Sequence, residues 1–160
     1  MTRYAEKTSV PSDRSRTEIE RTLTRYGATA FAYGWAGATA QIMFEIRTDR
    51  GVRRVRFALP MPDRNAKEFT HTPARNARRT PTAAAEAHEQ AVRQRWRALA
   101  LVIKAKLEAV AAGITSIEDE FLSHIMLPDG STVGEWAQPQ LALAYERGEM
   151  PPMLAAGPSS

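Results

Sequence analysis

The stretch AFAYGWAGATAQIMFEIRTDRGVRRVRFALP, residues 30–60, decides the fold, because large apolar residues alternate with small or polar ones along three successive segments. A period of two is the pattern of a β-strand with one buried face. The segments are separated by AG at 36–37 and by the polar TDRG at 48–51, both of which have turn chemistry. The stretch therefore predicts three strands joined as an antiparallel meander.

The segment before the meander follows a helical period instead. Ile19, Leu23 and Tyr26 lie at i, i+4 and i+7, so they form one apolar stripe of a helix that starts near Asp13 and stops at Gly27. We expect this helix to pack on one face.

The longest helix is predicted after the meander, from Pro81 or Thr82 to residues 112–113. Its middle is apolar nearly all round, which predicts burial on more than one side. The residues responsible are Ala98, Ala100, Leu101, Val102 and Ala105.

The C-terminal part predicts two shorter helices with a small hairpin between them. The hairpin covers residues 125–133 and turns at 128–130. Thr132 and Glu135 can form the capping box of the next helix, and Pro139 is expected to open a further segment that stops at Gly148. The whole is an α+β domain over residues 13–148, with flexible tails at 1–12 and 149–160.

Residues 60–81 connect the third strand to the long helix. Pro60 and Pro62 end the strand, and the segment has few large apolar residues but several arginines. We expect a long, mobile, basic loop, and loops of this length are functional or disordered.

Composition excludes several classes of chemistry. The 160 residues include no cysteine, so disulfides, cysteine-bound metals and thiol nucleophiles are ruled out. The longest apolar run, residues 98–103, is too short to span a membrane, and the N-terminus has no signal-peptide core. His71, His88 and His124 are scattered, and no catalytic motif is present. We therefore predict a cytoplasmic protein with no catalytic residue, metal site or cofactor.

Positive charge is concentrated in the first half of the chain. Residues 1–82 contain 16 Lys and Arg against eight Asp and Glu, whereas residues 83–160 contain six against ten. Arginine predominates, and its planar guanidinium suits bidentate contacts with phosphate and stacking on bases. The pattern favours an anionic partner; the alternative is that a high-GC genome uses arginine wherever a solvated cation suffices.

Two faces of the predicted sheet are candidates for that partner. Tyr33 and Trp35 project from one face, where they either stack on the bases of a single strand or form the core under the long helix. Arg54 and Arg56 are predicted on the opposite face, beside the basic loop. Our hypothesis is one continuous cationic surface over the third strand and the loop. It comprises Arg53, Arg54, Arg56, Arg75, Arg78, Arg79, Arg93 and Arg97, with Tyr33 and Trp35 as stacking rings.

Segments along nearly the whole chain carry a resemblance to a known family. They are SRTEIERTLTRYGA, RFALPMPD, EFTH, RQRWRALALVIKAKLEAVAAGI and EDEFLSHIMLPDGSTVGEW. With them the chain resembles a family of small uncharacterised proteins of tailed bacteriophages and prophages, notably of actinobacteria. The resemblance implies a phage origin and expression in a bacterial host cytoplasm, and it supplies no catalytic residue.

These observations lead to a non-enzymatic nucleic-acid-binding protein as the first hypothesis, with single-stranded DNA in phage DNA metabolism as the favoured ligand. One alternative is a protein-interaction module that binds a host factor through Trp136, Leu141, Leu143, Tyr145 and the C-terminal tail. Another is a sponge that sequesters a nucleotide signal in a basic pocket. Homo-oligomerisation is compatible with each hypothesis.

Overall fold

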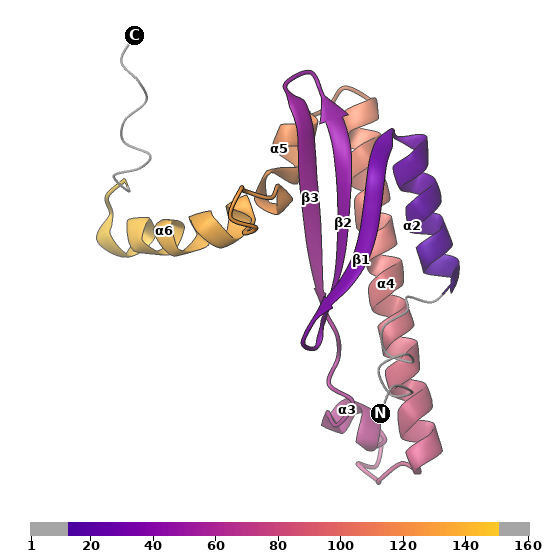
Figure 1. The fold of residues 1–160 in the computed structure, drawn as a ribbon. Helices are drawn as coiled ribbons and strands as arrows, with labels where there is room; N and C mark the ends of the chain where they lie inside the picture. The colour runs from indigo at the N-terminus through magenta and orange to yellow at the C-terminus, as the bar shows by residue number, and fades with distance from the viewer. Residues whose placement is uncertain (1–12, 151–160) are drawn as a thin grey trace.

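The fold is seen in a computed structural model that describes residues 13–150 (Figure 1). Three antiparallel strands form one sheet in the order β1 (Ala28–Ala36), β2 (Thr39–Thr48) and β3 (Gly51–Pro60). The predicted meander is confirmed. The tail expected at 1–12 lies outside the described residues, and so does the tail expected at 149–160 except for residues 149–150.

One face of this sheet carries the hydrophobic core. Phe44 of β2 lies between Phe31 of β1 and Val55 of β3, and all three side chains point to the same face because facing residues of paired strands share a side. Phe44 and Val55 are buried, whereas Phe31 on the edge strand is partly exposed. The alternation seen in the sequence therefore selects one buried face.

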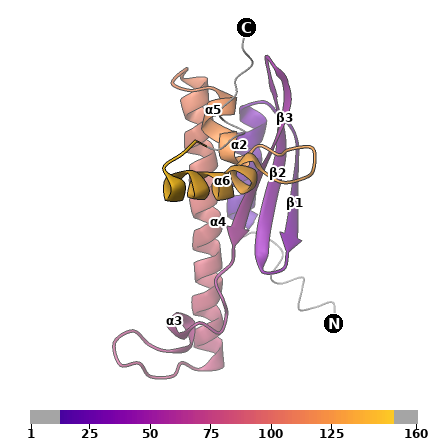
Figure 2. The same ribbon diagram turned by 90° about the vertical axis from the view of Figure 1, so that its left-hand side faces the viewer.

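Helices α2 (Asp13–Arg25) and α4 (Pro81–Ala111) cover that face, as Figures 1 and 2 show. Ile19 and Leu23 of α2 are fully buried, as the helical spacing predicted. Trp96 and Ile103 of α4 are buried on the same side of the sheet. The result is a two-layer α+β fold, which confirms the predicted class.

Only one side of α4 is buried, so the prediction of burial on more than one side is wrong. Leu101 is 55% exposed and Val102 is 44% exposed, and Ala98 and Ala105 are also exposed. The reason is geometric: the described fold has a single sheet, which covers one side of the helix and leaves the other to solvent.

The connection between β3 and α4 is more ordered than predicted. It contains α3 (Lys67–Thr70) and an isolated bridge between His71 and Arg78, so residues 60–81 are not one structureless loop. A helix of 31 residues is about 46 Å long and a strand of ten residues about 33 Å. The N-terminal end of α4 therefore overhangs the sheet, and α3 lies beside this overhang in Figures 1 and 2.

The C-terminal part begins with α5 (Ile117–Phe121) and a 3₁₀ turn, η1 (Leu122–His124). Phe121 closes the core between the rings of Phe44 and Phe57, at centroid distances of 5.8 and 6.1 Å. Ile125 then pairs with the edge of β3, and Met126 pairs with Thr132 across the predicted hairpin. This hairpin protects part of the free edge of β3.

The last helix, α6 (Val133–Arg147), is continuous through Pro139. The expectation that Pro139 opens a new segment is wrong, because the proline removes one backbone donor while the other bonds of the helix carry on past it. The predicted capping box between Thr132 and Glu135 is present, and Gly148 ends the helix in the left-handed conformation. None of the residues of α6 is buried.

Candidate nucleic-acid interface

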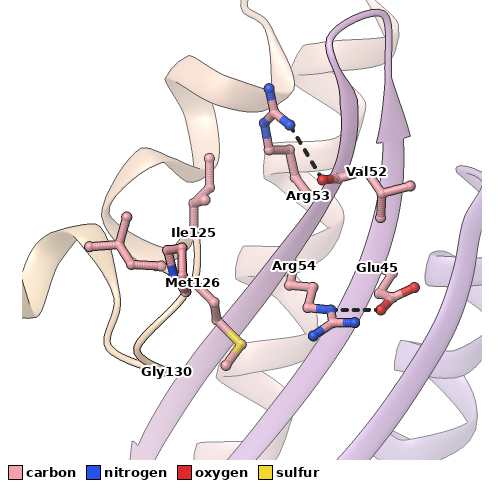
Figure 3. A pocket seen from close by; sticks show the side chains of 9 residues that line it. Glu45, Val52, Arg53, Arg54, Ile125, Met126 and Gly130 are labelled. Atoms are coloured by element: carbon pink, nitrogen blue, oxygen red, sulfur yellow. Dashed lines mark hydrogen bonds and ion pairs between the residues drawn. The ribbon is translucent and has the colours of Figure 1, made fainter.

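Arg53 and Arg54 leave β3 in different directions, and each meets a carboxylate. Arg54 Nε lies 2.8 Å from Glu45 Oε1, a contact drawn in Figure 3. Arg53 Nε lies 3.5 Å from Glu118 Oε1 at the start of α5. Both positive charges are therefore balanced by neighbouring negative charges within the molecule.

These two arginines border a depression between β3 and the hairpin at 125–132, shown in Figure 3. A nucleotide sponge needs an enclosed basic pocket whose cations are available to the ligand. This depression is open to solvent, and Arg53 and Arg54 are already paired. The depression is therefore not the enclosed pocket with available cations that a nucleotide sponge requires.

Arg56 acts as a clamp between β3 and the C-terminal part. Its Nη2 lies 2.7 Å and 2.8 Å from the two carboxylate oxygens of Glu135, and its Nη1 donates to the Gly130 carbonyl at 3.0 Å. The backbone N–H of Thr132 is the main cause that lowers the pKa of Glu135, and Arg56 adds to the shift. Arg56 is thus engaged in a structural contact.

The basic loop is closed by backbone hydrogen bonds. Arg79 N donates to Thr70 O at 2.7 Å, and Thr72 N donates to Ala77 O at 2.8 Å. Asn76 occupies the tight turn with a φ of 49°, a conformation that asparagine tolerates better than most residues. We call residues 70–79 the arginine loop, because this short hairpin carries Arg75, Arg78 and Arg79.

The arginine loop is anchored to α4 from the preceding segment. Phe69 is buried at 6% exposure, and its ring packs edge-to-face on His88 with centroids 5.4 Å apart. His88 Nε2 donates to the Pro62 carbonyl at 2.9 Å, since a carbonyl oxygen can only accept. These contacts fix both the start of the connection and the base of the loop on one helix.

The cations of the arginine loop are available to a ligand. Arg75, Arg78 and Arg79 form no ion pair with any of residues 13–150. Residues 64–82 contain five Lys and Arg against one Glu. The adjacent first turn of α4 contains no acidic residue, so the positive end of the helix dipole adds to this local charge.

Arg93 and Arg97 lie on the exposed surface of α4, away from the loop. They are about 18 and 24 Å along the helix from Pro81 at 1.5 Å per residue. Arg93 Nη1 lies 3.7 Å from Glu89 Oε1, one turn earlier. These residues are therefore on a separate part of the surface from the arginine loop.

Tyr33 and Trp35 lie on the sheet face that the helices cover. The ring of Tyr33 packs edge-to-face on buried Trp96, with centroids 6.0 Å apart, and Trp35 packs against the same core. The hydroxyl of Tyr33 is buried without a hydrogen-bond partner among residues 13–150. Burial raises the pKa of Tyr33 to about 12, and Glu20 adds to the shift. The structure therefore agrees with the interpretation that these two rings form part of the core under the long helix.

The hypothesis of one continuous cationic surface is therefore wrong. The arginines of β3 are neutralised by carboxylates, and Figure 1 places the arginine loop beyond the end of the sheet. Of the predicted interface residues, the fold brings Arg75, Arg78 and Arg79 together on one loop.

Sequence reasoning missed Phe69 and His88 as the anchors of this site. Phe69 is the one large aromatic residue in a polar, arginine-rich stretch, which is a signal of a local anchor. Its partner His88 lies 19 positions later on α4, a distance that no local pattern connects.

Within residues 13–150, no helix combines the length and apolar character of a membrane span, and no cluster of three His, Asp or Glu side chains could hold a metal ion. Comparison with protein-family models, curated proteins and solved structures found no match.

Proposed function

We propose that this protein binds nucleic acid without catalysing a reaction, and that the arginine loop contacts the phosphate backbone. The observation that carries the proposal is that Arg75, Arg78 and Arg79 lack ion pairs with residues 13–150 while their loop is hydrogen-bonded and anchored. A loop that is ordered beforehand loses less conformational entropy on binding.

Guanidinium groups on a loop suit phosphates, which carry charge but no sequence information. We therefore expect binding without sequence preference. The preference for single-stranded DNA rested on stacking by Tyr33 and Trp35, whose rings pack under the helices, so phosphate contacts favour neither single strands nor duplex. With the resemblance to phage proteins, we place this binding in phage DNA metabolism in a bacterial cytoplasm.

Fluorescence anisotropy with labelled single-stranded and duplex oligonucleotides at several salt concentrations tests the proposal. Each phosphate contact contributes about −0.9 to the slope of log K against log salt for duplex and about −0.7 for single strands. Three arginines predict slopes of roughly −2.7 and −2.1. The triple substitution Arg75→Gln, Arg78→Gln, Arg79→Gln should flatten the salt slope toward zero, because each substitution removes one phosphate contact. It should also weaken binding at low salt by about tenfold or more.

A matched control removes the same charge elsewhere. Arg47→Gln, Arg50→Gln and Arg54→Gln together change three exposed arginines at or near the β2–β3 turn, at the other end of the molecule. This variant should bind like the original protein. The proposal fails if neither oligonucleotide binds at low salt, or if both triple variants lose affinity equally.

A protein-interaction module is the second candidate, favoured by α6. Trp136, Leu141 and Tyr145 are exposed on this helix, which projects from the body of the molecule in Figure 1. Substitutions on α6 should leave the anisotropy titration unchanged, because α6 projects from the side of the molecule at the level of the sheet while the arginine loop lies beyond the end of the sheet in Figure 1.

A further inference from the structure

The tip of the arginine loop, residues 73–77, combines small side chains with two hydrogen-bond donors. Its sequence is PARNA, so a proline and two alanines surround Arg75 and Asn76. All five residues are exposed. The side chains of Arg75 and Asn76 form no hydrogen bond with any of residues 13–150. Both donors are therefore available to a ligand, and no bulky neighbour blocks its approach.

The backbone under the tip is closed by Thr72. Asn76 N donates to Thr72 O at 3.0 Å, and Ala77 N donates to Thr72 Oγ1 at 3.2 Å. Together with the bond from Thr72 N to Ala77 O, this residue makes three hydrogen bonds across the turn. Arg75 and Asn76 therefore project from a turn that is shaped before a ligand arrives.

The tip is also clear of the rest of the molecule. Figure 2 shows the connection between α3 and α4 extending away from both helices. Residues 69–85 contain no Asp or Glu, so the sequence around the tip has no carboxylate that would repel a polyanion. A ligand much larger than the loop can therefore receive the tip in a groove of its own.

The width of the tip suits the minor groove of duplex DNA. This groove is about 6 Å wide, whereas an α-helix has a diameter of about 10–12 Å and enters the major groove. A single turn of chain with methyl side chains on either side of its donors is far slimmer than a helix. A narrow minor groove also has an enhanced negative potential, which attracts arginine.

The chemistry of the two donors distinguishes the base pairs. In the minor groove, A·T pairs present only acceptors, adenine N3 and thymine O2, whereas guanine adds the donor N2–H₂. The guanidinium of Arg75 can only donate, and the amide nitrogen of Asn76 donates as well. These donors match an A·T-rich groove and would meet another donor at each guanine.

We infer that the tip of the arginine loop enters the minor groove of A·T-rich duplex DNA, where Arg75 and Asn76 donate to the base edges. Arg78 and Arg79 follow the tip and contact phosphates at the rim of the groove. The inference rests on the proposed function and names the ligand class for the same site. Phosphate contacts alone carry no sequence information, so a preference for A·T pairs would come from the tip.

The same geometry disfavours two other ligands. A single strand has no groove for the tip to enter. Duplex RNA has a wide, shallow minor groove, which would not surround a slim turn. Both should therefore bind less tightly than A·T-rich duplex DNA.

Fluorescence anisotropy of the full chain with duplexes of equal length and different base pairs tests the inference. The probes are an A·T duplex, a G·C duplex and an inosine·cytosine duplex. Inosine lacks the amino group of guanine, so its pair with cytosine resembles A·T in the minor groove and G·C in the major groove. The A·T and inosine·cytosine duplexes should bind about tenfold more tightly than the G·C duplex, which is the discrimination of one good base contact.

Three single variants locate the preference within the loop. Arg75→Gln should remove most of the difference between A·T and G·C duplexes. Asn76→Gly retains the charge and the left-handed backbone, so it should reduce the preference and leave the salt slope unchanged. Arg79→Gln is the matched control, because it removes the same charge from the base of the loop and should weaken both duplexes equally. Circular dichroism verifies that each variant folds.

The possible failures distinguish this inference from the proposed function. Equal affinity for A·T and G·C duplexes would overturn the inference and leave phosphate binding intact. An inosine·cytosine duplex that binds like G·C would also overturn it, because the contact would then lie in the major groove. So would a preference that survives both Arg75→Gln and Asn76→Gly. If no probe binds at low salt, the proposed function itself fails, and the inference fails with it.

Discussion

The arginines of β3 and the arginines of the loop at 70–79 belong to the same basic half of the chain, yet the fold gives them different surroundings. Arg54 and Arg56 each lie within 2.8 Å of a carboxylate oxygen. Arg75 and Arg78 are exposed and have no carboxylate partner among residues 13–150. Net charge therefore overstates the charge that a ligand can meet, and the positions of the carboxylates decide which cations remain available.

The position of the arginine loop depends on the packing of Phe69 against α4, so substitution of Phe69 should have the largest effect. Phe69→Ala empties a buried aromatic site next to His88 and should destabilise the protein by about 3 kcal/mol. The loosened loop should also bind oligonucleotides more weakly. Urea unfolding and anisotropy on the same sample measure the two effects.

Phe31→Ala is the matched control for this prediction, because Phe31 lies on the edge strand and is 40% exposed. It should cost less stability and leave oligonucleotide binding unchanged. If Phe69→Ala leaves the oligonucleotide affinity unchanged, the arginine loop does not need its contact with α4, and ordering of the loop before binding contributes nothing to affinity.

Among the arginines of β3, substitution of Arg56 should have the next largest effect. A hydrogen bond from a charged donor to a carbonyl such as that of Gly130 contributes about 1.5 kcal/mol, which corresponds to a roughly tenfold change in an opening equilibrium. Arg56→Gln should therefore speed amide exchange in residues 125–135 by about that factor. Amide exchange in the arginine loop should not change, which would distinguish the arginines of β3 from those of the loop.

The same clamp should show a pH dependence. The folded state lowers the pKa of Glu135 below its ordinary 4.5, mainly through the Thr132 N–H, so the carboxylate stabilises the fold above that pH. This contribution is lost as the pH falls through the lowered folded value. Glu135→Gln should flatten the stability profile in this acid range, and a profile identical to that of the original protein would contradict the assignment.

The sheet, α2 and α4 could be predicted from the sequence because each of them has its own local period, whereas the four residues of α3 have none and were expected to be part of a loop. The alternation in residues 30–60 and the stripe of Ile19 and Leu23 need no information from elsewhere in the chain. Burial of α4 on a second side was predicted wrongly, because an apolar surface shows what a helix could pack against and not whether a partner is present. Leu101 is exposed for this reason.

The candidate site was harder to predict, because ion pairs join distant parts of the chain. Glu135 lies 79 residues after Arg56, so no spacing rule could show that this arginine is occupied. The order of the loop likewise depends on the contact between Phe69 and His88. The arginines were identified by composition alone. The fold then paired those of β3 with carboxylates, placed Arg93 and Arg97 farther along α4, and left Arg75, Arg78 and Arg79 together on one loop.

The smallest effect is expected at Arg54, whose side chain is 71% exposed beside Glu45. Exposed ion pairs contribute about 0.2–1 kcal/mol, since water and salt screen the charges, so Arg54→Gln should change the unfolding free energy by about 0.5 kcal/mol or less. The oligonucleotide affinity of the Arg54→Gln variant should match that of the original protein at every salt concentration. A loss of affinity as large as that of Arg78→Gln would show that pairing with a carboxylate does not withdraw a cation from the ligand, and the contrast between the two groups would then have no functional meaning.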